Sequence, residues 1–368
     1  MIISSNDKIS TPQAAVVVTN FILATGILTL PRTSVEKVKT PDVWLTVILG
    51  GIIMMIAGVI MVKLSQQFPG KTFFQYNQEI LGKWFGWLLS LLIIFYFISI
   101  SGYQVRSMAE VTNFFLLEST PIWAIIMPFM WIGLYLNIGG INSIARMFEI
   151  ILPITIVFFL LVLFMSYKLF EIDNLRPVLG SGFLPVLKGL KTTTLAYSGP
   201  EIMLLLVAFM SQPNKAIKAV LIGTFIPLLF YVFLVIMVIG AFSINGVVVR
   251  TWPSIDLIRS FEIPGLIFER YESLLLVIWI MQIFASFTIS FYAAALGLAQ
   301  LFDKKVKFFI YCLLPVIYIV AMTPHTINEL FKLEDVLGNI IIILFGVLPL
   351  ILFIIIKWKR GKVDETIQ

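Results

Sequence analysis

The stretch Tyr197-Ser198-Gly199-Pro200-Glu201 is chemically unusual because it places a carboxylate inside a long apolar tract. A charged, unpaired acid in mid-bilayer costs about 2.5–3.5 kcal/mol or more. Gly199 and Pro200 interrupt a helix, since proline lacks the N–H group and glycine adds backbone freedom. Open backbone at membrane depth is tolerated only where protein or a water-filled cavity surrounds it. The stretch therefore predicts a broken transmembrane helix with an acid at the break.

A second interruption is predicted at residues 24–28, where small residues permit local unwinding ahead of Pro31. Unwound N–H groups attract a carboxylate, and exposed carbonyls attract an ammonium group. We expect Thr25, Gly26 and Ile27 to supply the N–H groups. Residues 197–199 would supply the carbonyls, so that the paired breaks form a mid-membrane site for a small zwitterion.

Side chains from two further segments could complete this site. Tyr96, Ser99 and Tyr103 share one helical face of the third apolar segment, and Thr288 and Tyr292 share a face of the eighth. For each of these residues the alternative is simple helix packing or an interhelical hydrogen bond. Ser286 and Ser290 offer a further alternative, a sodium site with carbonyls of the first segment.

The composition predicts a membrane protein, so both breaks are expected to lie within the bilayer. The chain has 368 residues, of which 60% are hydrophobic and 12% charged. Its mean hydropathy is +1.01. These values predict an all-α polytopic membrane protein, and the long unbroken apolar runs exclude a β-barrel. Ten spans are expected, at roughly 12–32, 42–64, 84–108, 121–138, 147–168, 184–210, 216–242, 272–301, 306–323 and 338–357.

The two breaks fall in the first and sixth of these spans. This spacing predicts two five-span halves of opposite topology, an inverted repeat of the LeuT type, at about 12–168 and 184–357 within one transmembrane domain. Ser10 and Gln13 form a candidate capping box at the start of the first span. The connections 65–83 and 243–271 could hold interfacial helices, or be ordinary loops.

Lysine and arginine are more frequent in the short segments on the side of the N-terminus, which favours both termini in the cytoplasm. The polar N-terminus predicts no signal peptide. One cysteine and one histidine, Cys312 and His325, argue against a disulfide and a metal site. No nucleophile–base pair or phosphate loop stands out, so we expect no enzyme, no cofactor and no nucleic-acid partner.

The segment Gly26-Ile27-Leu28-Thr29-Leu30-Pro31, together with Tyr-Ser-Gly-Pro-Glu, resembles the amino acid–polyamine–organocation transporter superfamily. More narrowly, the whole chain is similar to the B-subunits of bacterial spore germinant receptors, the GerAB-type family. The further features that it shares are Gly140, Ala145-Arg146, Glu149-Ile150, Pro153, Pro213-Asn214-Lys215 and Trp252-Pro253.

The resemblance implies a nutrient-sensing subunit of the inner spore membrane, with an A-subunit and a lipoprotein C-subunit as partners and membrane lipid around it. It carries over Thr25, Gly26, Ile27 and Tyr197 through Glu201 as ligand-binding residues. Pro200 departs from many transporters and stiffens the break. Two alternatives to a sensor stay open: a secondary amino acid transporter, possibly proton-coupled through Glu201, and an ion or water channel. Glu201 itself is either such a gating acid or a structural cap.

Overall fold

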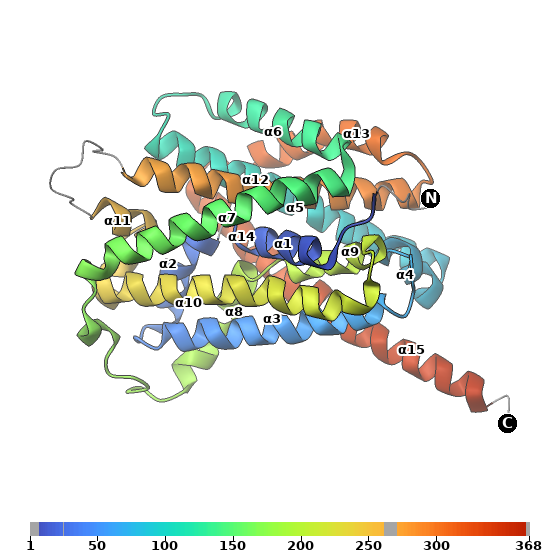
Figure 1. Cartoon of the computed structure of the whole chain (residues 1–368), viewed down its shortest axis with the longest axis horizontal. Coiled ribbons are helices and arrows are strands. Elements are labelled where there is room, and N and C mark those ends of the chain that lie inside the picture. Colours follow the sequence, from blue (N-terminus) through green and yellow to red (C-terminus); the bar gives the residue numbers. More distant parts are fainter. Residues whose placement is uncertain (1–6, 25, 261–270, 366–368) are drawn as a thin grey trace.

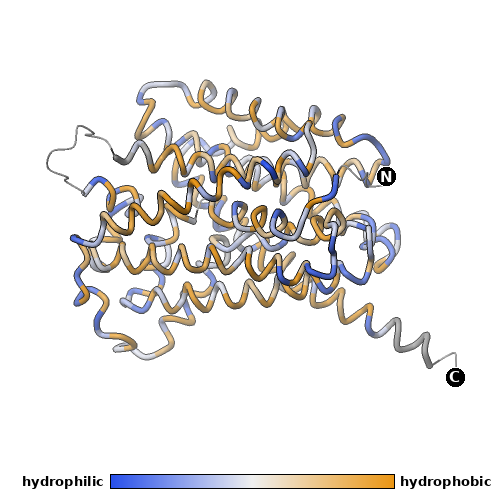
Figure 2. Tube along the Cα trace, viewed as in Figure 1, coloured by the Kyte–Doolittle hydropathy of each residue, from blue (hydrophilic) through white to orange (hydrophobic). Residues whose placement is uncertain are grey.

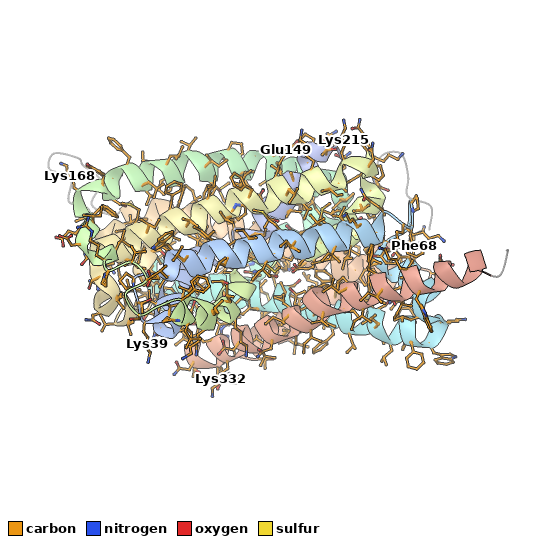
Figure 3. All side chains as sticks on the ribbon, turned by 90° about the horizontal axis from the view of Figure 1, so that it is seen from below. Lys39, Phe68, Glu149, Lys168, Lys215 and Lys332 are labelled. Atoms are coloured by element: carbon orange, nitrogen blue, oxygen red, sulfur yellow. The ribbon has the colours of Figure 1, made fainter. Side chains whose placement is uncertain are left out.

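The structure is a computed structural model that describes residues 7–24, 26–260 and 271–365. These residues form a bundle of helices running roughly along one direction (Figure 1). The chain enters α1 and leaves α15 at the same end of the bundle (Figure 1). Figure 3 shows Glu149 and Lys215 towards this end, which we call the terminal end, and Lys39, Lys168 and Lys332 towards the opposite, distal end.

Six helical segments of the described chain are long and apolar enough to cross a bilayer, and the bent pair α1–α2 adds a seventh if it is one span. Shorter apolar helices are Ile122–Ile138, Pro200–Phe209 and Val306–Met322. The predicted all-α polytopic class is confirmed. The count of ten spans requires these shorter helices to cross as well, with α8 joined to α9, and it stays a prediction, as do the repeat boundaries.

The spans are built from the following helices: α1 (Thr11–Ile22), α2 (Gly26–Val38), α3 (Val43–Ser65), α5 (Lys83–Phe115), α6 (Ile122–Ile138), α7 (Gly140–Ser166) with η2 (Tyr167–Leu169), α8 (Leu184–Ala196), η4 (Pro200–Ile202), α9 (Met203–Phe209), α10 (Ala216–Val248), α12 (Tyr271–Leu301), α13 (Val306–Met322), α14 (Ile327–Ile341), η6 (Ile342–Val347) and α15 (Leu348–Glu365). Short 3-10 turns, η3 (Ile172–Leu175) and η5 (Pro213–Lys215), lie in the connections on either side of the sixth span.

Local sequence explains several helix ends. The Ser10–Gln13 capping box is confirmed: the Gln13 backbone N–H donates to Ser10 Oγ at 3.3 Å, and the Ser10 N–H donates to Gln13 Oε1 at 2.9 Å. A second box, Thr72 with Gln75, begins α4 (Phe73–Leu81) in the predicted interfacial connection. The other long connection holds α11 (Pro253–Arg259).

The tenth span begins earlier than predicted. Helix α14 starts at Ile327, well before the expected start at residue 338. Glu329, Glu334 and Asp335 give its first half the polarity of a loop, which hides the helix from a hydropathy pattern. A π-helical turn, η6 (Ile342–Val347), follows α14 directly and joins it to α15. π-turns are rare and often occur at functional sites.

Apolar residues cover the length of the bundle, and polar residues gather at its two ends (Figure 2). Large side chains such as Phe164 and Trp131 point outwards, 84% and 63% exposed. An exposed apolar belt of this kind is unfavourable in water and suits lipid. The chain is a multi-pass membrane protein.

Candidate functional site

The break in the sixth span joins α8 to α9 through residues 197–199. Gly199 has φ 153° and ψ −41°, a conformation that L side chains rarely adopt. A Cβ atom there would collide with the Ile22 side chain and lie 3.1 Å from the Ile22 backbone nitrogen. Glycine is therefore required twice, for its backbone angle and for contact with the end of α1.

Glu201 holds this break together. Its carboxylate is fully buried. Oε1 accepts hydrogen bonds from Ser198 Oγ at 2.7 Å and Tyr96 Oη at 2.9 Å. Oε2 accepts the backbone N–H of Gly199 at 2.7 Å. The acid thus stabilises a backbone donor that the interrupted helix leaves open, and it joins α5 to the break.

The hydroxyls of Tyr96 and Ser198 also lie 2.9 Å from each other, so three oxygens form a closed triangle. Two hydroxyl protons serve its three oxygen–oxygen contacts when Glu201 is ionised. A proton on the carboxyl group would supply the third. The geometry therefore accommodates both protonation states without a change of partners.

The break in the first span bends α1 against α2 by 53°. Three carbonyls at this break accept a hydrogen bond from a side chain of another helix. Tyr231 Oη of α10 donates to Ile22 O at 2.5 Å, and Trp279 Nε1 of α12 donates to Ala24 O at 3.1 Å. Ser254 Oγ of α11 donates to Ile27 O at 2.7 Å. Thr25 lies outside the described residues.

The two breaks touch. A Cβ atom on Gly26 would lie 2.8 Å from Tyr231 Cζ and 3.2 Å from the Ala196 Cβ of α8. The rings of Tyr197 and Tyr231 meet edge to face, with centroids 5.3 Å apart. Tyr197 Oη donates to Val47 O of α3 at 3.0 Å. Tyr197 is thus placed at the junction with its hydroxyl directed to α3.

Helix α11 covers the first break at the distal end. Arg250 Nε lies 3.7 Å from Asp256 Oδ2, which connects α11 to the end of α10. Partial burial raises the pKa of the Asp256 carboxyl, and the charges of Arg250 and Arg259 act in the opposite direction. Ser254 on the same helix reaches the Ile27 carbonyl, so α11 closes this side of the site.

The remaining predicted residues are spread along the bundle. Tyr103 forms a hydrogen bond with Glu334 and lines a small cavity of about 20 Å³ with Leu28, Thr29 and Trp279. That volume is close to the room one water molecule needs. The structure therefore brings Tyr96 to the sixth-span break and Tyr103 next to the first-span break, on the distal side.

The two predicted residues of span 8 form hydrogen bonds with backbone groups, and their role in ligand binding stays a prediction. Thr288 Oγ1 bonds back to Phe284 O of its own helix at 2.9 Å. Tyr292 forms a hydrogen bond with the backbone of Ile141, at the start of α7. Helical periodicity correctly put both residues inside the bundle, but it could not fix which neighbour each one meets.

Ser286 and Ser290, considered for a sodium site, hydrogen-bond side chains of α5. Ser286 Oγ accepts from Gln104 Nε2, and Ser290 Oγ pairs with Ser101 Oγ, both at 2.8 Å. Their hydroxyls therefore connect α12 to α5. Neither of these two hydrogen bonds involves a carbonyl of the first span.

Sequence reasoning missed four residues: Tyr231, Trp279 and Ser254, which bind carbonyls of the first break, and Glu334, which lies beside it. Tyr231 and Trp279 sit in strongly apolar tracts, where an aromatic residue with a polar atom is common. Glu334 is the clearer case, because it lies only four residues before the predicted tenth span and a charged acid at membrane depth is costly, as it is for Glu201.

The known proteins that resemble this chain agree with one another. A family model described as "Spore germination protein" matches residues 8–330. This chain belongs to that spore germination family. Spore germination protein YndE of Bacillus subtilis (strain 168) is 54% identical over 98% of this chain and 99% of its own length. Spore germination proteins A2 and B2 of the same organism are 38% and 33% identical, each over at least 96% of both chains. The predicted resemblance is confirmed.

Two solved structures share the fold of this spore germination family member. A crystal structure of MhsT in complex with L-phenylalanine has a TM-score of 0.73 at 11% identity, covering 93% of this chain and 88% of that one. A closed, bromovinylhydantoin-bound structure of Mhp1, a nucleobase-cation-symport-1 family transporter, has a TM-score of 0.63 at 15% identity, covering 94% and 77%. The predicted LeuT-type class is confirmed at the level of the fold.

Proposed function

We propose that this chain is the germinant-sensing membrane subunit of a spore germination receptor and binds a small nutrient, an amino acid, at the two breaks. The observation that carries the proposal is the contact between the two breaks. Gly199 packs directly against Ile22 at the end of α1, and its backbone N–H is bound by the Glu201 carboxylate. Backbone groups of both breaks thus meet at one buried place, as a ligand with two opposite charges requires.

The contacts around the first break suggest how binding would be passed on. An ammonium group that bound the carbonyls of Ile22, Ala24 or Ile27 would compete with Tyr231, Trp279 or Ser254. These side chains come from α10, α12 and α11. Release of any of them changes the packing of another helix, so the ligand would shift the population between two arrangements of the bundle.

The receptor setting is part of the same proposal. We expect the protein in the inner spore membrane, with both termini in the cytoplasm, together with an A-subunit and a lipoprotein C-subunit. The supporting observation is the similarity over nearly the full chain to spore germination proteins A2 and B2. We expect the chain to have no enzymatic activity.

The test is ligand-dependent thermal stabilisation of the purified full chain in lipid nanodiscs, screened across the twenty common amino acids. At least one should raise the melting temperature. Tyr96→Phe should weaken the binding of that amino acid about three- to tenfold, because the substitution removes one hydrogen bond from the Glu201 network. Tyr135→Phe, 82% exposed on α6, is the matched control and should bind normally. No stabilisation by any amino acid would reject the proposal.

The second candidate is a secondary transporter for the same ligand, coupled to protons through Glu201. The oxygen triangle of Tyr96, Ser198 and Glu201 favours it, because the triangle accommodates Glu201 with or without a proton, as a group that takes up and releases a proton requires. Uptake of labelled amino acid into proteoliposomes by the chain alone, driven by a pH gradient, would favour the transporter. Binding without uptake would favour the sensor.

A further inference from the structure

A second carboxylate lies within the membrane-crossing part of this chain. Glu334 is on α14, inside the long apolar segment Ile327–Trp358. Its Oε1 accepts a hydrogen bond from Thr29 Oγ1 at 3.2 Å, and Tyr103 also bonds to the carboxylate. Its Oε2 is buried and has no hydrogen-bond partner among the described residues. A buried carboxylate oxygen without a donor is unfavourable, which points to a ligand group or solvent that completes it.

Glu334 opens onto a vestibule of about 350 Å³ at the distal end, between α2, α8 and α14. That volume lies in the range of small-molecule sites. Its lining includes Lys37 and Thr29, and Thr29 lies three residues beyond Gly26 of the first break. Thr29 also lines the small cavity beside Tyr103. The vestibule therefore leads towards the first break.

The walls of the vestibule carry opposite charges. Glu334 and Asp335 are on α14, whereas Arg32 and Lys37 are on α2 and Lys191 is on α8. Arg32 is paired with Glu36 at 2.8 Å. Within the described chain, neither Lys37 nor Lys191 has a carboxylate within 4 Å. An acidic wall facing a basic wall complements a molecule that carries both charges, and it gives no such advantage to a simple anion or a neutral sugar.

We propose that this vestibule is a recognition subsite for a small zwitterion, in which the Glu334 carboxylate binds the ligand's ammonium group and Lys191 binds its carboxylate. The subsite rests on the proposed function and adds a selection step before the breaks. The buried, unpaired Oε2 of Glu334 accepts the ammonium N–H once the ligand displaces the side chains that cover it, while Thr29 and Tyr103 keep the carboxylate in place. A ligand that lacks either charge loses half of its contacts here.

The experiment compares three probes on the full chain in nanodiscs: the amino acid that gives the largest thermal shift, its 2-hydroxy acid, which lacks the ammonium group, and its methyl ester, which lacks the carboxylate. Wild type should prefer the amino acid to both analogues. Glu334→Gln should weaken the binding of the amino acid about tenfold or more and leave the affinity for the 2-hydroxy acid nearly unchanged. Lys191→Gln should reduce the preference over the methyl ester. Lys191 is exposed, so this variant should fold normally.

Asp173→Asn is the matched control, because it removes one negative charge from an 83% exposed side chain outside the vestibule. Its amino acid affinity should equal that of wild type. Unchanged affinity in both Glu334→Gln and Lys191→Gln, with wild-type binding intact, overturns the subsite and leaves the proposed function standing. Wild type that binds no amino acid overturns both. Equal losses for all three probes in Glu334→Gln also overturn it, since they indicate a general structural effect.

Discussion

At the scale of single residues, Glu201 does most to define the sixth-span break. It satisfies two hydroxyls and one backbone N–H with its two oxygens, and it is fully buried. An amide at this position could do the same in one orientation: its oxygen would accept the Gly199 N–H, and its two N–H groups would donate to Tyr96 and Ser198. The methyl side chain of an alanine at position 201 would form none of these hydrogen bonds.

We therefore expect the free energy of unfolding of Glu201→Gln to lie within about 1 kcal/mol of the wild-type value. In Glu201→Ala it should fall by about 1–3 kcal/mol, because the Gly199 N–H is left buried without an acceptor. Thermal unfolding in detergent measures both. Equal loss in the two variants would show that the break needs a negative charge, which an amide cannot replace.

A substitution of Gly199 does not test ligand binding separately from folding. A valine at this position would block a ligand, but it would also disturb the fold. The φ angle of 153° and the contact with Ile22 now indicate that any side chain would force α1 and the break apart. The sequence showed that a glycine was present at the break; only the packing of α1, which periodicity does not provide, shows why it is needed.

At the scale of elements, Tyr231 connects the two broken spans. Its hydroxyl binds Ile22 O, its ring lies against Gly26, and its edge meets Tyr197. A side chain on Gly26 would meet the Tyr231 hydroxyl first. The position of span 7 thus depends on a glycine in span 1.

Gly26→Ala should destabilise the protein, and Tyr231→Phe should cost about 1 kcal/mol through the lost bond to Ile22. Together they should cost less than the sum, by about 0.5–3 kcal/mol, because the phenylalanine removes the atom nearest to the new methyl group. A double-mutant cycle of thermal or denaturant unfolding measures this. Strict additivity would mean that the two residues do not interact.

How far the elements were predictable depended on their polarity. The breaks were found because glycine, proline and an acid interrupt apolar runs, and the capping box at Ser10 because its spacing is local. The first half of α14 cannot be predicted from hydropathy, because its acidic residues give it the composition of a loop. The partners of Tyr292 and Ser286 are set by the rotation of α12 within the bundle, which depends on neighbours far away in sequence.

At the scale of the whole molecule, polar residues gather at both ends of the bundle (Figure 2). Lys215 lies towards the terminal end and Lys168 towards the distal end (Figure 3). Both are exposed and lie outside the apolar belt. The LeuT-type class could be predicted because breaks in the first and sixth spans are a rare combination. The orientation in the membrane rests on charge alone.

The single cysteine allows a direct test of that orientation. In a Cys312→Ser background, Lys168→Cys should react with a membrane-impermeant maleimide in intact cells, and Lys215→Cys only after permeabilisation. This follows from cytoplasmic termini and from the opposite positions of the two lysines. The Cys312→Ser parent is the control and should stay unlabelled. The reverse pattern would invert the orientation, and labelling of both from outside would contradict the fold.

The π-helical turn in the last span has a consequence for chain length. Phe345 of this turn packs on Tyr96 with ring centroids 4.9 Å apart, next to the Glu201 network. A π-turn holds one residue more than an α-turn, and one residue corresponds to about 100° of rotation in a helix of 3.6 residues per turn. The turn therefore sets the angular phase between the polar face of α14 at the vestibule and the apolar face of α15. Loss of one residue here would keep the span long enough to cross the bilayer and yet turn one of these faces away from its surroundings.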